Sequence, residues 1–278
     1  MKQTIELFKP DSFSERSFIK CIWKSTKSDF ETEQEIILPK GNAEIIFNLG
    51  NDVFYCSLIN KSVDKMPQCM INGINTIPHT LIKNKNQSFI GIQLYPFALN
   101  YLFNTPVVYF TNRVVNGFDV CTSLKVLFER LKTCNFFDDQ VLIILSWLKL
   151  LSDSSQSRNN HKKFFDLVDN TAIDNLKCKK IHSLCNLSDR HLRRLSCHFF
   201  GMSLEQYILY RMYLNSMMAI HDLNKSLTFI AHDNGFYDQS HFIRCFKTFT
   251  GLTPGEYRRK MSEMPGHIYN KDQSLMSV

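Results

Sequence analysis

The segment from 227 to 257 carries two short helical patterns separated by a turn. Apolar residues recur at helical spacing up to Ala231, and Gly235 follows where a helix would end in the left-handed conformation. Asp238 can then cap a second helix. The apolar face of that helix is formed by Phe242, Cys245, Phe246 and Phe249. The pattern predicts a helix-turn-helix with a basic, amide-bearing outer face, and an ordinary helical hairpin with a solvated polar face is the alternative.

A second copy of this pattern lies about fifty residues earlier in the chain. A shift of 50 residues aligns His191 with His241, Leu192 with Phe242, Arg194 with Arg244, Phe199 with Phe249, Gly201 with Gly251 and Tyr207 with Tyr257. Upstream of the turn, a shift of 49 aligns Cys178, Ile181, Asn186 and Leu187 with Leu227, Ile230, Gly235 and Phe236. One supersecondary unit therefore occurs twice.

The two copies resemble the DNA-binding motifs of a known family. The order IA, GF, DQS, HF, R, F, K, F, TG, TP and EY between 230 and 257 closely resembles the second helix-turn-helix of AraC/XylS-type transcription regulators. The sequence SDRHLRRLSCHFFGMSLEQY at 188–207 is similar to the more divergent first motif of that family. In this first copy His182 stands in place of Ala231 and Ser196 in place of Phe246, two changes that favour looser packing.

The resemblance covers about 100 residues and implies a one-component bacterial transcription regulator that binds double-stranded DNA. It favours activation of transcription, with RNA polymerase as a partner, although no residue pattern separates an activator from a repressor. A longer helix expected over 203–221 would hold two recognition helices so that both reach successive major-groove segments, about 34 Å apart. One chain would then cover two segments of the groove.

Base reading is assigned to outward residues in the early turns of the two expected recognition helices. Arginine can pair bidentately with guanine and glutamine with adenine, each worth roughly 1–3 kcal/mol of discrimination. The candidates are Arg190, Arg193, Arg194, Gln239, Ser240, His241 and Arg244. Arg194 and Arg244 could also contact a phosphate. Phosphate contacts that position the protein are expected from Lys247, Arg258, Arg259 and Lys260. The alternative for each residue is a solvated surface charge.

The first half of the chain is expected to be β-rich. Short runs rich in Ile, Val, Phe and Tyr, separated by turn residues, extend from 18 to 96. Gly50 and Asn51 predict a tight hairpin between Phe47 and Val53. Several short antiparallel strands suggest a sandwich or barrel, and the resemblance implies a cupin-like barrel that binds a small-molecule effector or mediates homodimerisation. The predicted fold class is α+β, with this β-rich half, which carries helices, followed by an all-α double helix-turn-helix half.

The sequence shows no catalytic or metal-binding constellation in this half. His79 is the only histidine before His161, whereas a metal-dependent cupin enzyme needs a histidine cluster. The alternating carboxylates are interpreted as a solvated sheet face, for example Glu31, Glu33, Glu35 and Glu44. We therefore expect neither enzyme activity nor a cofactor. The alternative is a small-molecule-binding protein or enzyme in which the helical half only docks, and a sequence-indifferent architectural protein is a further rival.

Helical spacing returns after residue 97. The stretch 138–151 has more apolar surface than one helix usually buries in its own domain, so it either mediates dimerisation or docks on the β-rich half. Residues 152–161 are polar without apolar periodicity and form the expected linker. The expected domains are 1–151 for effector binding or dimerisation, 162–262 for DNA binding, and 263–278 as a mobile tail.

The charge distribution agrees with this division. Residues 1–153 hold 16 Lys and Arg against 15 Asp and Glu, and residues 154–278 hold 17 against 11. The net charge of +7 therefore lies almost entirely in the second part. A domain that binds a polyanion, joined to a nearly neutral partner, would show this asymmetry.

The nine cysteines form no CxxC pair and are expected to be reduced and mostly buried. A metal site built from Cys178, His182 and Cys185, with His191 or His198, matches no zinc spacing. The N-terminus lacks an apolar signal segment, and the apolar run from 141 to 151 is too short to cross a bilayer. We expect a cytoplasmic protein without membrane contact.

Overall fold

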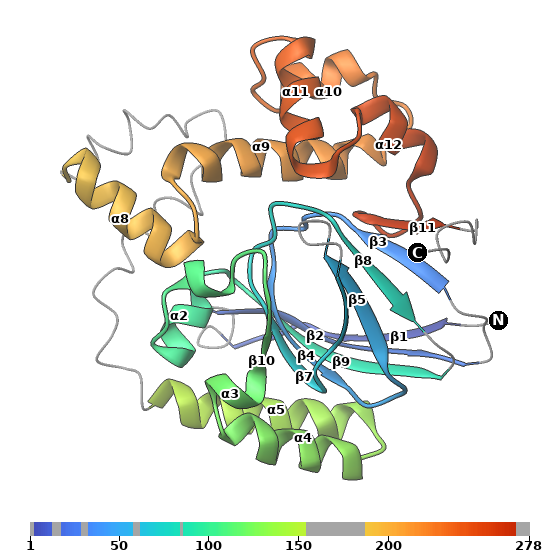
Figure 1. Cartoon of the computed structure of the whole chain (residues 1–278), viewed down its shortest axis with the longest axis vertical. Helices are drawn as coiled ribbons and strands as arrows, with labels where there is room; N and C mark the ends of the chain where they lie inside the picture. The colour runs from blue at the N-terminus through green and yellow to red at the C-terminus, as the bar shows by residue number, and fades with distance from the viewer. Residues whose placement is uncertain are drawn as a thin grey trace.

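Two antiparallel sheets and two groups of helices form the computed structural model of this chain (Figure 1). It describes residues 3–12, 18–28, 33–57, 62–83, 86–153 and 187–270. The six-stranded sheet has the order β1 (Gln3–Phe8), β2 (Ile19–Lys27), β9 (Gln87–Leu94), β4 (Ala43–Asn48), β7 (Cys69–Asn72) and β10 (Val114–Asn116). The five-stranded sheet has the order β11 (His267–Asn270), β3 (Glu33–Ile37), β8 (His79–Lys83), β5 (Val53–Ser57) and β6 (Val63–Lys65). The predicted α+β fold, a β-rich part followed by helices, is confirmed.

Helices cover one face of the six-stranded sheet and leave its other face toward the second sheet. The covering elements are α2 (Ala98–Phe103), η1 (Val107–Phe110), α3 (Gly117–Val120), α4 (Ser123–Thr133) and α5 (Phe137–Asp153). Successive strand residues alternate between faces, so Ile45 and Phe47 of β4 pack against the helices while Glu44 and Ile46 line the space between the sheets. The core of this half therefore lies between the sheet and the helices.

Helix α5 docks on the β-rich half, one of the two roles predicted for it. Ile144 and Leu148 are buried in the core shared with the sheet, and the indole of Trp147 donates a 2.8 Å hydrogen bond to the Ser123 hydroxyl. On the outer side of the helix, Leu142 and Leu150 remain exposed.

The predicted hairpin between Phe47 and Val53 is wrong, because the segment between them crosses from one sheet to the other. Strand β4 pairs with β7 and β9, whereas β5 pairs with β6 and β8. The Asn48 side chain shapes the crossing by accepting from the Gly50 amide and donating to the Asn51 carbonyl. A turn signal between two apolar runs identifies a turn but not the sheet that the second strand joins.

The described C-terminal helices are α8 (Asp189–Phe200), α9 (Leu204–Ile220), α10 (Leu227–Asp233), α11 (Gln239–Thr250) and α12 (Pro254–Lys260). Four of them, α8 to α11, lie where the sequence predicted helices, and α12 is a further helix that it did not predict. The hydroxyl of Ser203 accepts from the Gln206 amide and the Gln206 side chain accepts from the Ser203 amide, which fixes the start of the joining helix α9. Residues 152 and 153 of the predicted linker belong to α5, and the rest of the linker lies outside the described residues, as does the first helix of the first motif, around Cys178 and Ile181. Within the part of the chain that the structure describes, no helix is long and apolar enough to span a membrane.

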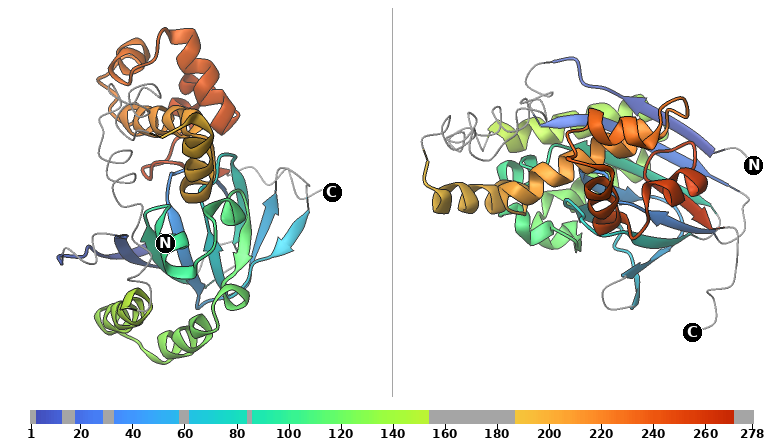
Figure 2. Two further views of the ribbon diagram at one scale, coloured as in Figure 1. Left: turned by 90° about the vertical axis from the view of Figure 1, so that its left-hand side faces the viewer. Right: turned by 90° about the horizontal axis from the view of Figure 1, so that it is seen from above.

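Helix α9 lies over the N-terminal half (Figure 2). Two buried tyrosines anchor it there. The Tyr210 hydroxyl donates to the Asn75 carbonyl at 2.7 Å and accepts from the Gly41 amide at 2.9 Å. The Tyr213 hydroxyl donates to the Pro39 carbonyl at 2.9 Å. Both side chains are 0% exposed. The C-terminal helices and the β-rich half are thus joined through specific buried hydrogen bonds.

The segment after α12 contains a strand where the sequence predicted the start of a mobile tail. Residues 267–270 form β11 and pair antiparallel with β3, and the Leu38 amide donates to the Gly266 carbonyl at 2.8 Å. Ile268 is buried in the cluster that holds the C-terminal helices. This burial and pairing give an ordered position to a segment in which the sequence shows no helical pattern. Residues 271–278 lie outside the described part.

We predict that Tyr213→Phe lowers the free energy of unfolding by about 1–3 kcal/mol, because the Pro39 carbonyl loses a buried hydrogen-bond donor. Urea unfolding followed by circular dichroism measures the change. Tyr237→Phe is the matched control, since Tyr237 is 92% exposed and should lose almost nothing. Equal stability of the two variants would show that the Tyr213 hydroxyl does not anchor α9.

Candidate DNA interface and internal pocket

Helix α11 presents polar side chains on a rigid apolar base. The Asp238 carboxylate accepts from the His241 amide at 2.6 Å, so the helix starts at a fixed position. Phe242 and Phe246 are fully buried and hold its inner face. The predicted reading residues Gln239, Ser240 and Arg244 and the predicted phosphate contact Lys247 are all exposed. Amide, hydroxyl and guanidinium groups are thereby free to meet the edges of bases.

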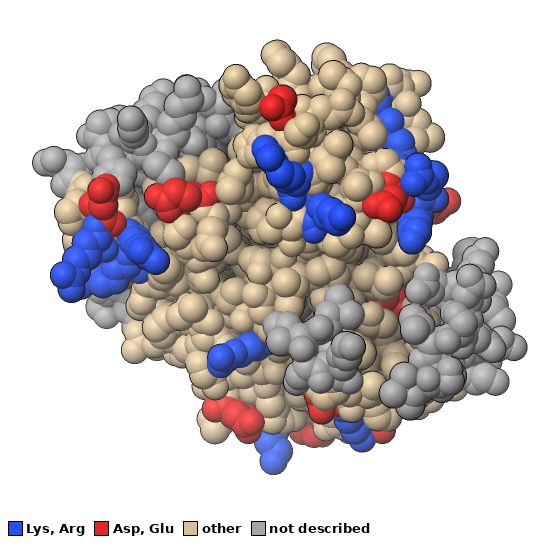
Figure 3. Space-filling view, turned by 45° about the horizontal axis from the view of Figure 1, so that its top comes forward, with Lys and Arg blue, Asp and Glu red and all other residues tan. Residues whose placement is uncertain are grey.

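Helix α8 has the same design with more charge. The Ser188 hydroxyl accepts from the His191 amide, and Leu192 and Phe199 are buried. The predicted reading residues Arg190, Arg193 and Arg194 are exposed. In the view of Figure 3, Lys and Arg side chains lie in separate groups, among them one at the left edge, one near the upper centre and one at the upper right.

Ser196 of the first motif stands where the second motif has Phe246. It occupies the place of a core aromatic residue and is fully buried, and its hydroxyl donates to the Met202 carbonyl at 2.9 Å. A satisfied buried hydroxyl replaces the aromatic packing, so the smaller side chain leaves no unpaired polar group. The other departure, His182, and the cysteines 178 and 185 lie outside the described residues.

Two candidate residues make contacts within the protein. His241 is half-buried, and its Nδ1 accepts from the Tyr237 amide at 3.4 Å while its ring meets Phe236 edge-on. Arg258 is half-buried and donates from Nη2 to the Lys225 carbonyl at 2.9 Å. These contacts give His241 a role in shaping the turn and Arg258 a role in fastening α12. The remaining predicted phosphate contacts, Arg259 and Lys260, are exposed.

Tyr237 is an exposed residue of this surface that the sequence analysis missed. It lies in the turn just before α11 and is 92% exposed. An aromatic side chain directly before the cap of a recognition helix is the signal that could have identified it. Its ring and hydroxyl project next to the first turn of α11.

The two recognition helices lie on different sides of α9. In Figures 1 and 2, α8 extends from α9 toward the sheets, while α10 and α11 lie on the side away from them. Gly201 ends α8 in the left-handed conformation against the Thr111 side chain, where a Cβ atom would come within 2.0 Å of the Thr111 hydroxyl oxygen. The end of α8 is therefore fitted closely to the N-terminal half.

Comparisons with known proteins support the interpretation of these helices. A family described as a helix-turn-helix domain matches residues 183–260. The chain is also 27% identical over 96 residues to the probable transcription factor PqrA of Proteus vulgaris, over 34% of this chain and 79% of that protein. The resemblance to AraC/XylS-type transcription regulators is thus confirmed over this C-terminal segment. A domain of unknown function (DUF6597) matches residues 16–116 of the chain.

Solved structures of related regulators resemble the chain only weakly. ToxT from Vibrio cholerae covers 93% of this chain and 98% of its own length at 13% identity, with a TM-score of 0.46. A structure of ToxT bound to an unsaturated fatty acid covers 94% and 96% at 11% identity, with a TM-score of 0.47. The AraC-like activator CuxR has a TM-score of 0.17 at 10% identity, over 92% of this chain and 84% of its own.

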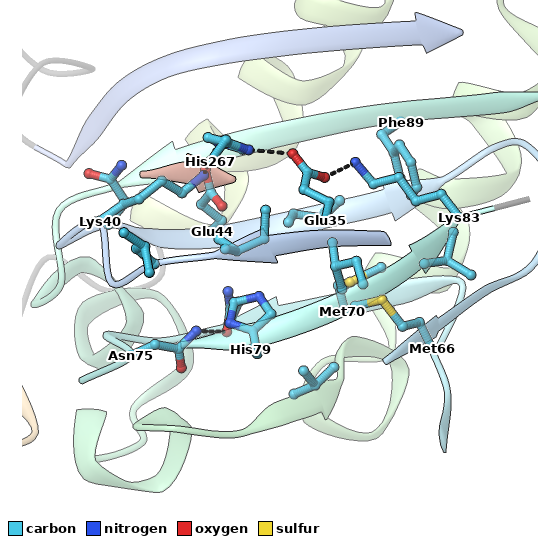
Figure 4. A pocket seen from close by; sticks show the side chains of 18 of the residues that line it. Glu35, Lys40, Glu44, Met66, Met70, Asn75, His79, Lys83, Phe89 and His267 are labelled. Atoms are coloured by element: carbon cyan, nitrogen blue, oxygen red, sulfur yellow. Dashed lines mark hydrogen bonds and ion pairs between the residues drawn. The ribbon is translucent and has the colours of Figure 1, made fainter. Parts of the chain in front are cut away.

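A pocket lies between the two sheets in the β-rich half of the chain (Figure 4). Its empty space is about 870 Å³, including its opening to solvent. The apolar lining is Trp23, Ile37, Leu38, Ile46, Val53, Met66, Met70, Leu81, Phe89 and Val114. The polar lining is Glu35, Lys40, Asn42, Glu44, Asn72, Asn75, His79, Lys83 and His267. A mostly apolar wall with a few polar groups is typical of small-molecule sites.

Glu35 and Glu44 face this pocket, which corrects their assignment to a solvated sheet face. Glu35 is 1% and Glu44 6% exposed, and Gln93 donates to Glu44 at 3.1 Å. Alternation along β3 and β4 was recognised in the sequence, but both faces of each strand are covered. An alternating pattern identifies two faces without showing which of them meets water.

Glu35 is ionised within a chain of polar contacts. Burial opposes its charge, but the hydrogen bond from His267 and the Lys83 ammonium outweigh burial and hold the pKa of the Glu35 carboxyl well below its usual range. Burial and the nearby Lys40 charge lower the pKa of His267 in spite of Glu35. The neutral His267 ring thus donates from Nδ1 to Glu35 at 2.5 Å and accepts at Nε2 from Lys40 at 3.2 Å.

No described group of three or more His, Cys, Asp or Glu side chains is arranged to hold a metal ion. Glu35 is paired with Lys83 and His267 within this lining. The polar lining suits recognition of a molecule by hydrogen bonds.

His79 makes the stability of this half depend on pH. Burial lowers the pKa of His79 to about 4. Lys40 and His267 lower this pKa further, while the negative charge of Glu35 raises it. The unfolded chain protonates this histidine near pH 6.5, whereas the folded chain keeps it neutral until about pH 4. Acidification from pH 7 to 4.5 therefore favours the unfolded chain.

We predict that His79→Gln reduces the loss of unfolding free energy between pH 7 and 4.5 by on the order of 1–2 kcal/mol. Urea unfolding at both pH values measures the difference, which isolates His79 from the other titrating groups. His232→Gln, at an exposed position on α10, is the control and should leave the pH dependence unchanged. An equal acid loss in wild type and His79→Gln would contradict the assignment.

Proposed function

We propose that this regulator is a sequence-specific DNA-binding activator of transcription that reads two successive major-groove segments with α8 and α11. The observation that carries the proposal is the repeated pair of capped helices, each with long polar side chains exposed in its early turns. The base-reading set is Arg190, Arg193, Arg194, Gln239, Ser240 and Arg244, with His241 supporting the turn. Lys247, Arg259 and Lys260 contact phosphates, while Arg258 positions α12. Activation would proceed through contact with RNA polymerase at the bound promoter.

Control by the N-terminal half acts through the loop that follows β3. Lys40 lines the pocket, and its two neighbours Pro39 and Gly41 hold the hydroxyls of Tyr213 and Tyr210. A molecule that shifts Lys40 therefore shifts the anchor of α9. Because α8 and α11 lie on different sides of α9 in this docked arrangement, a change in the anchor alters how the two helices align on one face of DNA.

The effector is a mainly apolar small molecule with a neutral polar end. Ten apolar side chains line the pocket, whereas its charged lining groups include both signs, with Lys40 able to donate and Glu44 able to accept. A primary amide satisfies both groups, while a free carboxylate would add a third negative charge to those of Glu35 and Glu44. A homodimer, with the exposed face of α5 as its contact, remains compatible with this control.

Selection of bound sequences from a random duplex pool, at near-physiological salt, tests the DNA-reading function. We expect a bipartite site whose halves lie about one helical turn apart. Enrichment of no sequence, with binding that vanishes steeply as salt rises, would favour an architectural protein or a small-molecule-binding protein whose helices only dock.

We predict that Arg193→Ala and Gln239→Ala each relax preference at one base position, at a cost of roughly 1–3 kcal/mol at the selected site. Lys247→Ala should weaken all sequences alike and reduce the salt dependence. Binding to the selected site and to single-base variants of it, at several salt concentrations, measures both effects. Lys149→Ala, at an exposed position on α5 distant in sequence from both recognition helices, is the control and should leave DNA binding unchanged. Uniform losses for all three interface variants would remove the distinction between base reading and phosphate contact.

We predict that decanamide binds the pocket and that Ile46→Phe, which fills it, weakens binding by about tenfold, or about 1.4 kcal/mol. Titration calorimetry measures the affinity. Val126→Phe, at a position 64% exposed on α4, is the control and should bind like wild type. Decanoate binding more tightly than decanamide would contradict the neutral polar end.

A further inference from the structure

Strand β11 connects the DNA-binding helices to the wall of the pocket. The chain leaves α12 and enters the five-stranded sheet as its edge strand. The Gly266 amide donates to the Tyr257 hydroxyl of α12 at 3.0 Å, while the Gly266 carbonyl accepts from the Leu38 amide of the N-terminal half at 2.8 Å. The backbone of Gly266 thus bonds to both parts of the protein: its amide bonds to α12 and its carbonyl bonds to the N-terminal half.

The two faces of β11 meet different parts of the molecule. Alternation places His267 toward the pocket and Ile268 toward the helices. On the paired strand β3, Glu35 faces the pocket while Ile36 packs against the helical cluster. A two-strand layer is therefore all that separates the pocket from the DNA-binding helices at this edge.

The pocket face of β11 is fastened by contacts that a pocket ligand can replace. Lys40 donates to His267, which donates to Glu35 (Figure 4). A polar ligand group that accepts from Lys40 removes one of these two contacts of His267. The backbone pairing of β11 spans only four residues at the sheet edge, so its detachment exposes less than the detachment of any central strand.

We propose that residues 266–270 form a detachable latch that a pocket ligand loosens, and that latch release lets the helices realign and bind DNA more tightly. This inference rests on the proposed DNA-reading function and names the device that regulates it. The docked latch holds α12 and, through Tyr257 and the buried cluster, the end of α9. Release removes the pairing with β3 and leaves the helix-turn-helix core intact.

A reversible crosslink tests the latch. Ile36 and Ile268 lie directly opposite each other across the β3–β11 pair, a separation suited to a disulfide. We expect the oxidised Ile36→Cys/Ile268→Cys protein to bind the selected DNA about tenfold more weakly than the same protein after reduction. The single-cysteine variants and the wild type, given the same treatments, control for the native cysteines. Equal affinities with the crosslink verified by mass would overturn the latch.

A second variant covers failure of the crosslinked protein to fold. Ile268→Asp places a charge in the helical cluster and should detach the strand, raising DNA affinity several-fold and removing its dependence on decanamide. Val126→Asp is the exposed control. An unchanged or lower affinity in a folded Ile268→Asp protein would count against the proposal.

Hydrogen exchange separates the latch from the DNA-reading function. Decanamide should speed exchange of the 267–270 amides and leave those of the six-stranded sheet unchanged. If the wild type selects no DNA sequence but this exchange responds, the proposed function fails while the latch stands. Sequence-specific binding without any effect of decanamide on exchange at β11 would mean that the proposed function stands while the latch fails.

Discussion

The hydrogen bonds of Tyr210 and Tyr213 fix the relation between the two halves of the protein. Each hydroxyl is fully buried and bonds to backbone groups of the N-terminal half, so separation of the halves leaves polar atoms unpaired unless water replaces them. Both tyrosines lie on α9, which joins the two helix-turn-helix motifs. The position of the DNA-reading surfaces therefore depends on a loop of the β-rich half.

Electrostatics makes the pocket and its neighbours interdependent. The carboxylate of Glu35 is stable in a buried site only because Lys83 and His267 compensate for the loss of water. One of these partners belongs to the N-terminal half and the other follows the DNA-binding helices. Removing His267 from the site leaves a buried charge with fewer partners, so the state of β11 and the polarity of the pocket change together.

Sequence reasoning predicted the local structure well because local signals determine it. Caps such as Ser188 and Asp238 and the apolar faces of the helices appear where the spacing placed them. It failed where segments far apart meet. The inward direction of Glu35 depends on a second covered face, and β11 depends on pairing with β3, more than two hundred residues earlier. Six of the seven predicted base-reading residues are exposed and His241 is half-buried, and the contacts of all seven with DNA remain a prediction.

The strength of regulation is limited by what a ligand can gain in one arrangement over the other. Coupling between sites in proteins is typically about 1–3 kcal/mol, a factor of roughly 5–150 in affinity. Detaching β11 loses a few backbone hydrogen bonds, one buried isoleucine and one histidine contact. At about 0.5–1.5 kcal/mol for each hydrogen bond and about 1.5–3 kcal/mol for the isoleucine, the cost is several kcal/mol, so a ligand shifts this equilibrium in part. Detachment of the whole α9 interface would require far more, because it buries two tyrosines and their hydroxyls. The short edge strand is thus the contact between the halves whose detachment a small ligand can influence most.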